Sequence, residues 1–276
     1  AKSFKTLGIN QNGLPLTTAN VPDLSASTVK PESVNHFEVG LKTQFWDRRA
    51  TFNLSAFLTE IKDFQATVNG GQFGTVRGYL ANAEKVRSEG LEADFKIRAS
   101  DRFTAYVNGA YTDAKYVRFT NAPCPPELSG GTTATAGQTP SAPGVAGGIS
   151  PANCNISGQR LPGVSEWSLS YGLESNVPAK LFGAEGQVYL GVDGSYRSNF
   201  SSNPSPSAYT WIDGYALTIL RLGFRTEGGL NVYGWVRNAF DVDYFEQLAV
   251  PSGNTGLIAG SPGDPRTFGG TIKVEF

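Results

Sequence analysis

Hydrophobic and polar residues alternate along much of the chain with a period of two. In residues 34–45, VNHFEVGLKTQF, apolar side chains such as Val39 share one parity, while Glu38 and Lys42 share the other. Successive side chains of a β-strand point to opposite faces, so this period predicts a strand rather than a helix. Residues 50–58 alternate in the same way, and only residues 46–49 separate the two segments. This spacing predicts a hairpin with a tight turn.

The same alternation predicts about nine strands. They cover residues 34–45, 50–58, 90–98, 103–111, 166–174, 186–196, 214–225, 230–238 and 268–276. The connections between them are alternately short and long, and the long ones, such as the interval that contains the Gly-rich residues 69–78, are rich in turn formers. A transmembrane barrel has short turns on one side of the membrane and long loops on the other. A soluble sandwich also has one apolar and one polar face, but nothing in it requires this asymmetry.

Strand length, aromatic residues near strand ends and the loop asymmetry favour an all-β fold, namely a transmembrane antiparallel β-barrel. We expect its apolar face to meet lipid and its other face to line the lumen. The charges on the lumenal parity are Glu38, Lys42, Glu92, Asp94, Lys96, Arg98, Lys273 and Glu275. We expect these residues to form cross-strand ion pairs, and a path for a solute is the alternative.

Composition agrees with this interpretation and removes other classes of protein. Charged residues make up only 17% of the chain, aromatic residues make up 12%, and there are 33 glycines, which favours strands over helices. The net charge of −1 offers no basic field to nucleic acid. No apolar run approaches the roughly 20 residues that a membrane-spanning helix needs.

The sequence contains no constellation typical of an enzyme. His36 is the single histidine, and no nucleotide-binding motif is found. We therefore predict no catalytic residue, no cofactor and no metal site, and we expect His36 to be an ordinary lumenal residue.

The only two cysteines, Cys124 and Cys154, lie in one long segment rich in Gly, Pro, Ser, Thr and Ala. A disulfide that closes this loop in an oxidising compartment is the economical interpretation, and two isolated free thiols are the alternative.

A barrel in lipid must close, because hydrocarbon offers no hydrogen-bond partner to the edge of a sheet. Bacterial single-chain barrels also have even numbers of strands. We therefore expect the missing strands to lie upstream of Ala1 or on another chain, with the sequence a mature or internal part of a longer polypeptide.

Several motifs carry a resemblance to a known family. They are VKPESVNHFEVGLK at 29–42, DFQATV at 63–68, NAEKVRSEGLEADF at 82–95, AYTDAKYVRFTNAPCP at 110–125, WVRNAFDVDYF at 235–245 and GDPRTFGGTIKVEF at 263–276. The region from Val29 to the end resembles the C-terminal part of the barrel of TonB-dependent outer-membrane receptors. The resemblance covers about nine tenths of the chain, and the motifs are specific together although each is weak alone.

The resemblance implies part of a 22-stranded barrel in the bacterial outer membrane, in contact with outer-membrane lipid. Residues 1–30 would form a loop that leads into the barrel. Residues 31–276 would form the C-terminal barrel segment, with a long extracellular loop at 113–163. The last strand ends at Phe276, which the resemblance implies is a signal for the barrel assembly machinery; the alternative is that Phe276 is only the lipid-facing end of a strand.

The implied function is energised uptake of a scarce small-molecule nutrient, such as a siderophore-iron chelate, cobalamin or a carbohydrate. The implied partners are an upstream plug and barrel segment, on the same or a separate chain, and a TonB-type energy-coupling protein that acts through that segment. Neither a plug nor a TonB box is found before Val29. The alternative function is a structural scaffold in a larger surface assembly, without transport.

Substrate binding in such receptors falls to the extracellular loops and the apex of the plug, so residues 121–160 are the candidate region. The candidate ligand contacts are aromatic residues near loop ends: Tyr116, Phe119, Phe200, Tyr209 and Trp211. The alternative role of these rings is the aromatic belt at the membrane interface.

A further group of polar residues belongs to the family-like motifs near the end of the chain. It consists of Asn238, Asp241, Asp264 and Arg266. We expect these residues to fix the ends of a loop rather than to bind substrate, because Asn and Asp are typical turn residues.

Overall fold

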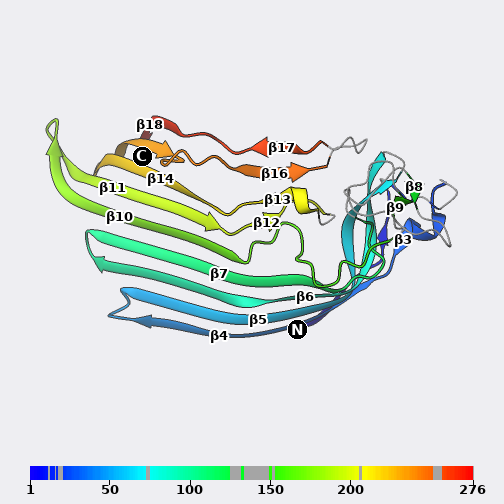
Figure 1. Cartoon of the computed structure of the whole chain (residues 1–276). Helices are drawn as coiled ribbons and strands as arrows, with labels where there is room; N and C mark the ends of the chain where they lie inside the picture. The colour runs from blue at the N-terminus through cyan, green and yellow to red at the C-terminus, as the bar shows by residue number, and fades with distance from the viewer. Residues whose placement is uncertain are drawn as a thin grey trace.

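The computed structural model describes residues 1–275, except residues 12, 16, 18–20, 73–74, 125–131, 134–148, 151–152, 205–206 and 251–256. Its main feature is a ten-stranded antiparallel sheet in which the strands follow one another in chain order (Figure 1). The strands are β1 (Lys2–Lys5), β4 (Glu32–Phe45), β5 (Ala50–Gln72), β6 (Thr75–Ser100), β7 (Phe103–Arg118), β10 (Trp167–Leu181), β11 (Ala184–Arg197), β14 (Tyr215–Thr226), β15 (Leu230–Arg237) and β18 (Thr267–Val274). Within the described residues, no helix is both long and apolar enough to cross a membrane.

Nine of these ten strands are the ones that the alternation predicts, and β1 is the tenth. β1 runs antiparallel to β4, with Lys2 opposite Asn35. Residues 1–30, expected as a loop, therefore include a strand of the sheet. They also include the short pair β2 (Gly8–Ile9) and β3 (Thr28–Val29) and the 3-10 helix η1 (Leu24–Ser27). The alternation does not predict β1, because four residues are too few to show a period of two.

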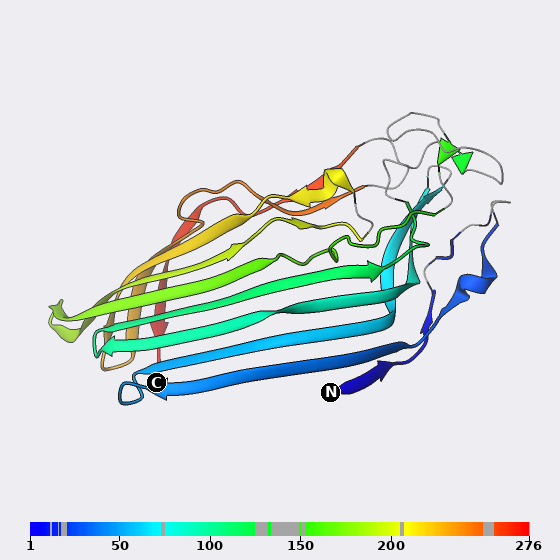
Figure 2. The same cartoon turned by 60° about the horizontal axis from the view of Figure 1, so that its bottom comes forward.

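Short turns lie at one end of the sheet and long connections lie at the other (Figures 1 and 2). The turn between β10 and β11 consists of Phe182 and Gly183, whose φ angles are 50° and 84°. Two consecutive positive φ angles make a hairpin turn whose twist matches that of the strands. The long-loop end carries short strand pairs and a 3-10 helix: β8 (Thr132–Thr133) with β9 (Ile149–Ser150), β12 (Phe200–Ser201) with β13 (Trp211–Ile212), β16 (Phe245–Ala249) with β17 (Ala259–Pro262), and η3 (Ala208–Thr210).

β5 and β6 are much longer than predicted. Residues 69–72 and 75–78 of the Gly-rich interval belong to the strands and not to a loop, because the ladder continues until Gln72 lies opposite Thr75. β7 likewise runs to Arg118 and so takes up the beginning of the predicted loop 113–163. Glycine weakens a strand but does not end it while a partner strand continues to supply hydrogen bonds. We call residues 63–72 and 75–86 the β5–β6 arm; it bends away from the rest of the sheet at the long-loop end (Figure 2).

Side-chain amides hold the N-terminal segment along this arm. The Asn10 side chain donates to the backbone oxygen of Leu80 (3.0 Å) and accepts from its nitrogen (2.6 Å). Nε2 of Gln65 donates to the oxygen of Thr6 (2.7 Å), and Oδ1 of Asn82 accepts from the nitrogen of Lys30 (2.7 Å). An amide mimics a backbone unit in both donor and acceptor, so it can pair an irregular segment with a strand.

The strand register divides the sheet into an apolar and a polar face. Val39, Leu222 and Ile272 lie on the first face, where they are 73%, 61% and 72% exposed. A contiguous exposed apolar face on membrane-barrel strands is the face that meets lipid. We call it the outward face and call the opposite face lumenal.

The outward apolar band on β7 covers about three quarters of the roughly 25 Å apolar band of a membrane barrel. On β7 it runs from Phe103 to Tyr111, about 26 Å along the strand and about 19 Å across the membrane at a tilt of 45°. Tyr111 and Trp167 meet at its upper edge, with ring centroids 4.9 Å apart, as in an interfacial aromatic belt. Beyond this edge the outward positions become charged, as at Glu60 and Glu89.

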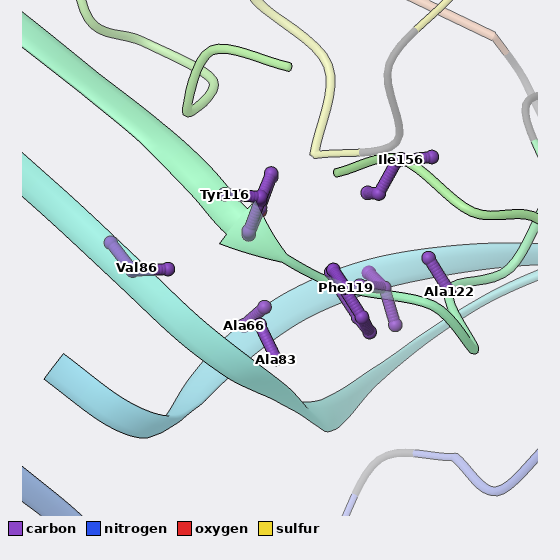
Figure 3. Close-up of a cluster of buried hydrophobic side chains, with 8 residues drawn as sticks. Ala66, Ala83, Val86, Tyr116, Phe119, Ala122 and Ile156 are labelled. Carbon is purple, nitrogen blue, oxygen red and sulfur yellow. The ribbon is translucent and has the colours of Figure 1, made fainter. Parts of the chain in front are cut away.

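A cluster of buried hydrophobic side chains lies beyond the outward apolar band, where β5, β6 and β7 approach the long-loop end; Figure 3 shows its members in close-up. Its members are Ala66, Val68, Ala83, Val86, Tyr116, Phe119, Ala122 and Ile156. A barrel wall has lipid on one side and a lumen on the other, so it needs no two-layer core of its own. The β5–β6 arm leaves the membrane, and it therefore has to bury its apolar side chains against β7 and the returning loop.

Candidate functional site

A network of ion pairs and tyrosines crosses the middle of the lumenal face. Arg221 on β14 pairs with Asp193 on β11 at 2.5 Å, and the hydroxyl of Tyr106 on β7 donates to the same carboxylate at 3.2 Å. Arg225 pairs with Glu174 on β10 at 2.6 Å. The register explains how these groups meet, because each pair lies on neighbouring or next-neighbouring strands of the same face.

The lack of a side chain at Gly172 allows the Tyr106 hydroxyl to reach Asp193. Tyr106, Gly172 and Asp193 lie directly opposite one another on three successive strands. A Cβ atom on Gly172 would lie 2.3 Å from Cε1 of Tyr106, so any side chain there would displace the ring. The ring crosses the intervening strand only because that strand has no side chain at the crossing.

An open cavity of about 410 Å³ lies beside this network on β11, β14, β15 and β18. It is lined by Asp193, Ile219, Arg221, Tyr233, Trp235, Arg237 and Thr271. Trp235 donates through Nε1 to the hydroxyl of Thr271 at 3.2 Å, and the guanidinium of Arg237 lies 4.8 Å from the Trp235 ring centroid. The wall therefore presents fixed donors and aromatic faces to the lumen, which suits contact with a polar solute or another polar protein surface.

The eight lumenal charges singled out in the sequence pair differently from expectation. Glu38 lies 3.5 Å from His36, Arg98 lies 2.8 Å from Asp101, and Lys273 lies 2.5 Å from Glu275. Each of these contacts is local in sequence, and within the described residues none of the eight forms a cross-strand ion pair. The prediction of cross-strand pairing is wrong for these eight residues. The alternation assigns a charge to a face of the sheet, but it does not specify which residue of the neighbouring strand lies at the same height. Glu92 and Asp94 instead line a second open cavity, of about 290 Å³.

Three of the five aromatic candidates are buried. Tyr116 and Phe119 are each 1% exposed within the cluster of Figure 3, with ring centroids 5.3 Å apart. Burial raises the pKa of Tyr116 to about 12. Phe200 is also buried, beneath the guanidinium of Arg197 at 3.4 Å. These three rings are therefore packed inside the long-loop end and do not offer an accessible surface to a ligand.

The segment that follows Cys154 returns beside β7, and this explains the burial of Tyr116 and Phe119. Cys124 and Cys154 are bonded, and Cys154 also exchanges backbone hydrogen bonds with Ala122 at 2.9 and 3.1 Å. The chain then returns beside β7, where the nitrogen of Ile156 donates to the oxygen of Phe119 at 3.0 Å. Much of the candidate region 121–160 lies outside the described residues, but its two ends are fixed against each other.

The other two aromatic candidates are accessible. Tyr209 is 66% exposed and Trp211 is 38% exposed, both at the long-loop end. The Arg160 guanidinium lies 5.4 Å from the Trp211 ring centroid and 2.9 Å from a carboxylate oxygen of Glu166. Exposed aromatic faces next to an arginine can stack on a planar ligand and bind its charge.

The group near the end of the chain fixes a loop, which confirms the prediction. The side chain of Asn238 accepts from the nitrogen of Val242 at 2.9 Å and donates to the oxygen of Asp264 at 3.1 Å. Asp241 accepts from both the backbone and the guanidinium of Arg266, at 3.1 Å each. Asn238 and Asp241 also have positive φ angles of 47° and 55°, which these residue types tolerate.

Three further points compare the predicted site residues with the structure. Phe276 lies outside the described residues, so its role as an assembly signal stays a prediction. The described residues contain no group of three or more His, Cys, Asp or Glu side chains that could hold a metal ion. The predicted site residues do not include Asp193, Arg221 and Tyr106, which form the lumenal network. The alternation could have assigned each of these three residues to the lumenal face, but it could not show that they meet.

The comparison with known families decides what this architecture is. A family model for the β-barrel of TonB dependent receptor-like proteins matches residues 1–239. The chain belongs to this family. It is accordingly a β-barrel chain of the bacterial outer membrane, with antiparallel membrane-spanning strands.

Solved structures of TonB-dependent receptors have the same fold. The ferric yersiniabactin uptake receptor FyuA from Yersinia pestis aligns with a TM-score of 0.68 and 17% identity, over 100% of this chain and 34% of its own. The ferric-catecholate import receptor Fiu from K12 E. coli aligns at 0.61 and 20%, over 100% and 32%. The copper transporter OprC aligns at 0.64 and 15%, over 100% and 36%. The chain thus spans about a third of the length of these receptors.

Proposed function

We propose that the chain forms part of the barrel wall of an outer-membrane receptor that takes up a scarce nutrient with energy from a TonB-type partner. The observation that carries the proposal is the division of the sheet: an outward apolar band, a lumenal wall of fixed polar groups, and exposed aromatic residues at the long-loop end. In the proposed arrangement, an upstream segment supplies the remaining strands and a plug that fills the lumen.

The proposed nutrient is a metal chelate such as a ferric siderophore. Support comes from the similar solved structures, which are receptors or transporters for ferric yersiniabactin, ferric catecholates and copper. Tyr209 and Trp211 are the proposed ligand contacts, with Arg160 beside Trp211 for a negative charge on the chelate. Outer-membrane lipid would cover the outward band, and the barrel assembly machinery would recognise the last strand.

An uptake assay tests this proposal. The complete polypeptide to which the chain belongs is produced in a bacterial strain that lacks its own receptors, and uptake of labelled ferric chelates, cobalamin and oligosaccharides is measured. We expect uptake of one ferric chelate, which stops when the inner-membrane energy partner is deleted while binding at the cell surface remains.

The ligand contacts are tested in the same strain. Tyr209→Ala with Trp211→Ala is expected to weaken binding of that chelate by about tenfold, because each stacked ring contributes roughly 0.5–1.5 kcal/mol. Trp46→Ala, which removes an exposed ring at the short-turn end, is the matched control. If no labelled compound is taken up although the protein is folded in the outer membrane, the transport proposal fails and a scaffold role replaces it.

A further inference from the structure

The last three strands of the sheet, β14, β15 and β18, carry cations but no carboxylate. None of the three contains Asp or Glu, and their lumenal positions hold Arg221, Arg225, Arg237 and Lys273. Residues outside these strands pair with three of the four cations: Asp193 with Arg221, Glu174 with Arg225, and Glu275 with Lys273. Arg237 is the fourth. Its side chain is exposed and, within the described residues, has no ion pair or hydrogen bond.

Unpaired charges elsewhere on the lumenal face occur with both signs, so they offset one another. On β4 and β6, the cations Lys42 and Lys96 share the face with the carboxylates Glu92 and Asp94. Arg237 has no such counterpart on β15 or on the neighbouring strands β14 and β18. Asp241, four residues further along the chain, already accepts from the guanidinium of Arg266 at 3.1 Å. The positive charge of Arg237 is therefore left without compensation in the described part of the chain.

The cavity beside Arg237 offers hydrogen-bond donors. Arg237 lines the open lumenal cavity of about 410 Å³, where its guanidinium lies 4.8 Å from the centroid of the Trp235 ring. The Thr271 hydroxyl accepts from Nε1 of Trp235 at 3.2 Å, so its own proton remains available, and the Tyr233 hydroxyl has no hydrogen bond within the described residues. The one carboxylate that lines the cavity, Asp193, is already engaged in the network described above. Donors and positive charge suit an anion with two oxygen acceptors.

The position of Arg237 favours a resident partner over a passing solute. Arg237 lies opposite Thr267, and the next residue, Phe268, is 82% exposed on the outward face, so Arg237 lies in the lumen at the height of the outward apolar band. In the arrangement proposed above, a plug fills the lumen at this height and excludes water from the wall. An unpaired cation in such surroundings is costly. A solute that passes only occasionally leaves this cost in place, whereas a resident carboxylate removes it.

We propose that Arg237 and its cavity dock an Asp or Glu side chain of the plug segment. The planar guanidinium can donate two parallel hydrogen bonds to a carboxylate, and the Trp235 ring beside it limits its orientations. The backbone that follows is also fixed, because Asn238 bonds to both Val242 and Asp264. This inference rests on the part of the proposed function that places a plug in the lumen, and it does not require transport.

Carbodiimide cross-linking of the complete polypeptide tests the proposal. Arg237→Lys places an amine at the cavity, and a carbodiimide joins an amine to a carboxylate in direct contact with it, forming an amide with loss of water. Mass spectrometry of the digested protein then identifies the coupled carboxylate. The matched control is Arg118→Lys on β7, because Nε of Arg118 lies 3.8 Å from Glu84; there we expect coupling to Glu84 alone.

The expected result is coupling of the introduced lysine to one Asp or Glu of the upstream segment. Arg237→Gln should then accelerate amide hydrogen exchange around that carboxylate by at least about tenfold. Changing the same carboxylate to its amide in the Arg237→Gln protein should add nothing, because the pair is already broken.

Three results would overturn the proposal: coupling to Asp193 alone, coupling to no carboxylate, or coupling only to citrate added as a small anion. The last result would identify a site for a passing solute. These outcomes are independent of the uptake assay. A cross-linked protein that takes up no labelled compound rejects transport and keeps this inference, whereas uptake without the cross-link keeps transport and rejects this inference.

Discussion

Single tyrosines link strands across glycines on both faces of the sheet. On the lumenal face, Tyr189 crosses Gly223 and donates to Asn231 at 3.0 Å. On the outward face, Tyr171 crosses Gly194 and its hydroxyl lies 3.1 Å from that of Thr218. In both cases the glycine leaves room for the ring and the hydroxyl reaches a polar group on the strand beyond. Each such bridge also buries the polar end of a tyrosine, which matters most on the face that meets lipid.

The outward bridge gives a test at a single residue. A Cβ atom on Gly194 would lie 2.3 Å from Cζ of Tyr171, so Gly194→Ala displaces the ring and breaks its contact with Thr218. We expect a loss of about 1–3 kcal/mol in the free energy of unfolding, measured by denaturant titration of the complete polypeptide from lipid vesicles. Gly234→Ala is the control, since its nearest neighbour would be 3.8 Å away. Equal effects of the two substitutions would show that the bridge contributes nothing.

At the scale of elements, the β5–β6 arm behaves as a separate packing unit. The strands in the membrane band are held by their ladders and by lipid, whereas the arm depends on the cluster of Figure 3 and on the loop that returns from Cys154. The arm and its loop should therefore open without disturbing the strands in the membrane, as local units of low stability do in other proteins.

Removal of one ring from the cluster tests this independence. Phe119→Ala leaves a cavity in a fully buried site, which costs roughly 3–5 kcal/mol in local stability. We expect faster amide hydrogen exchange in residues 63–86 and 114–122, with unchanged exchange in the membrane parts of β10, β11 and β14. Tyr209→Ala, which removes an exposed ring, should leave both regions unchanged. Faster exchange throughout the sheet would mean that arm and barrel unfold together.

For the whole molecule, alternation in the sequence predicts nine of the ten strands and assigns the two faces, because the membrane imposes a strict period of two. The alternation does not specify the height of a residue along the membrane normal. Asp193 and Arg221 meet because of the register between β11 and β14, which no local pattern specifies. The burial of Tyr116 depends on a loop that returns from a distant disulfide. Faces were therefore predictable, while contacts and the buried candidates were not.

The orientation of the sheet in the membrane is the property on which the other conclusions depend, and one strand suffices to test it. On β14, Leu222 lies on the outward face and Leu217 lies on the lumenal face, opposite Ser195. An arginine facing lipid near the bilayer midplane costs about 2–4 kcal/mol, whereas one facing the lumen keeps its hydration. Leu222→Arg should therefore destabilise the complete polypeptide in vesicles by that amount, and Leu217→Arg by much less. If Leu217→Arg is the more damaging substitution, the lipid and lumenal faces are exchanged.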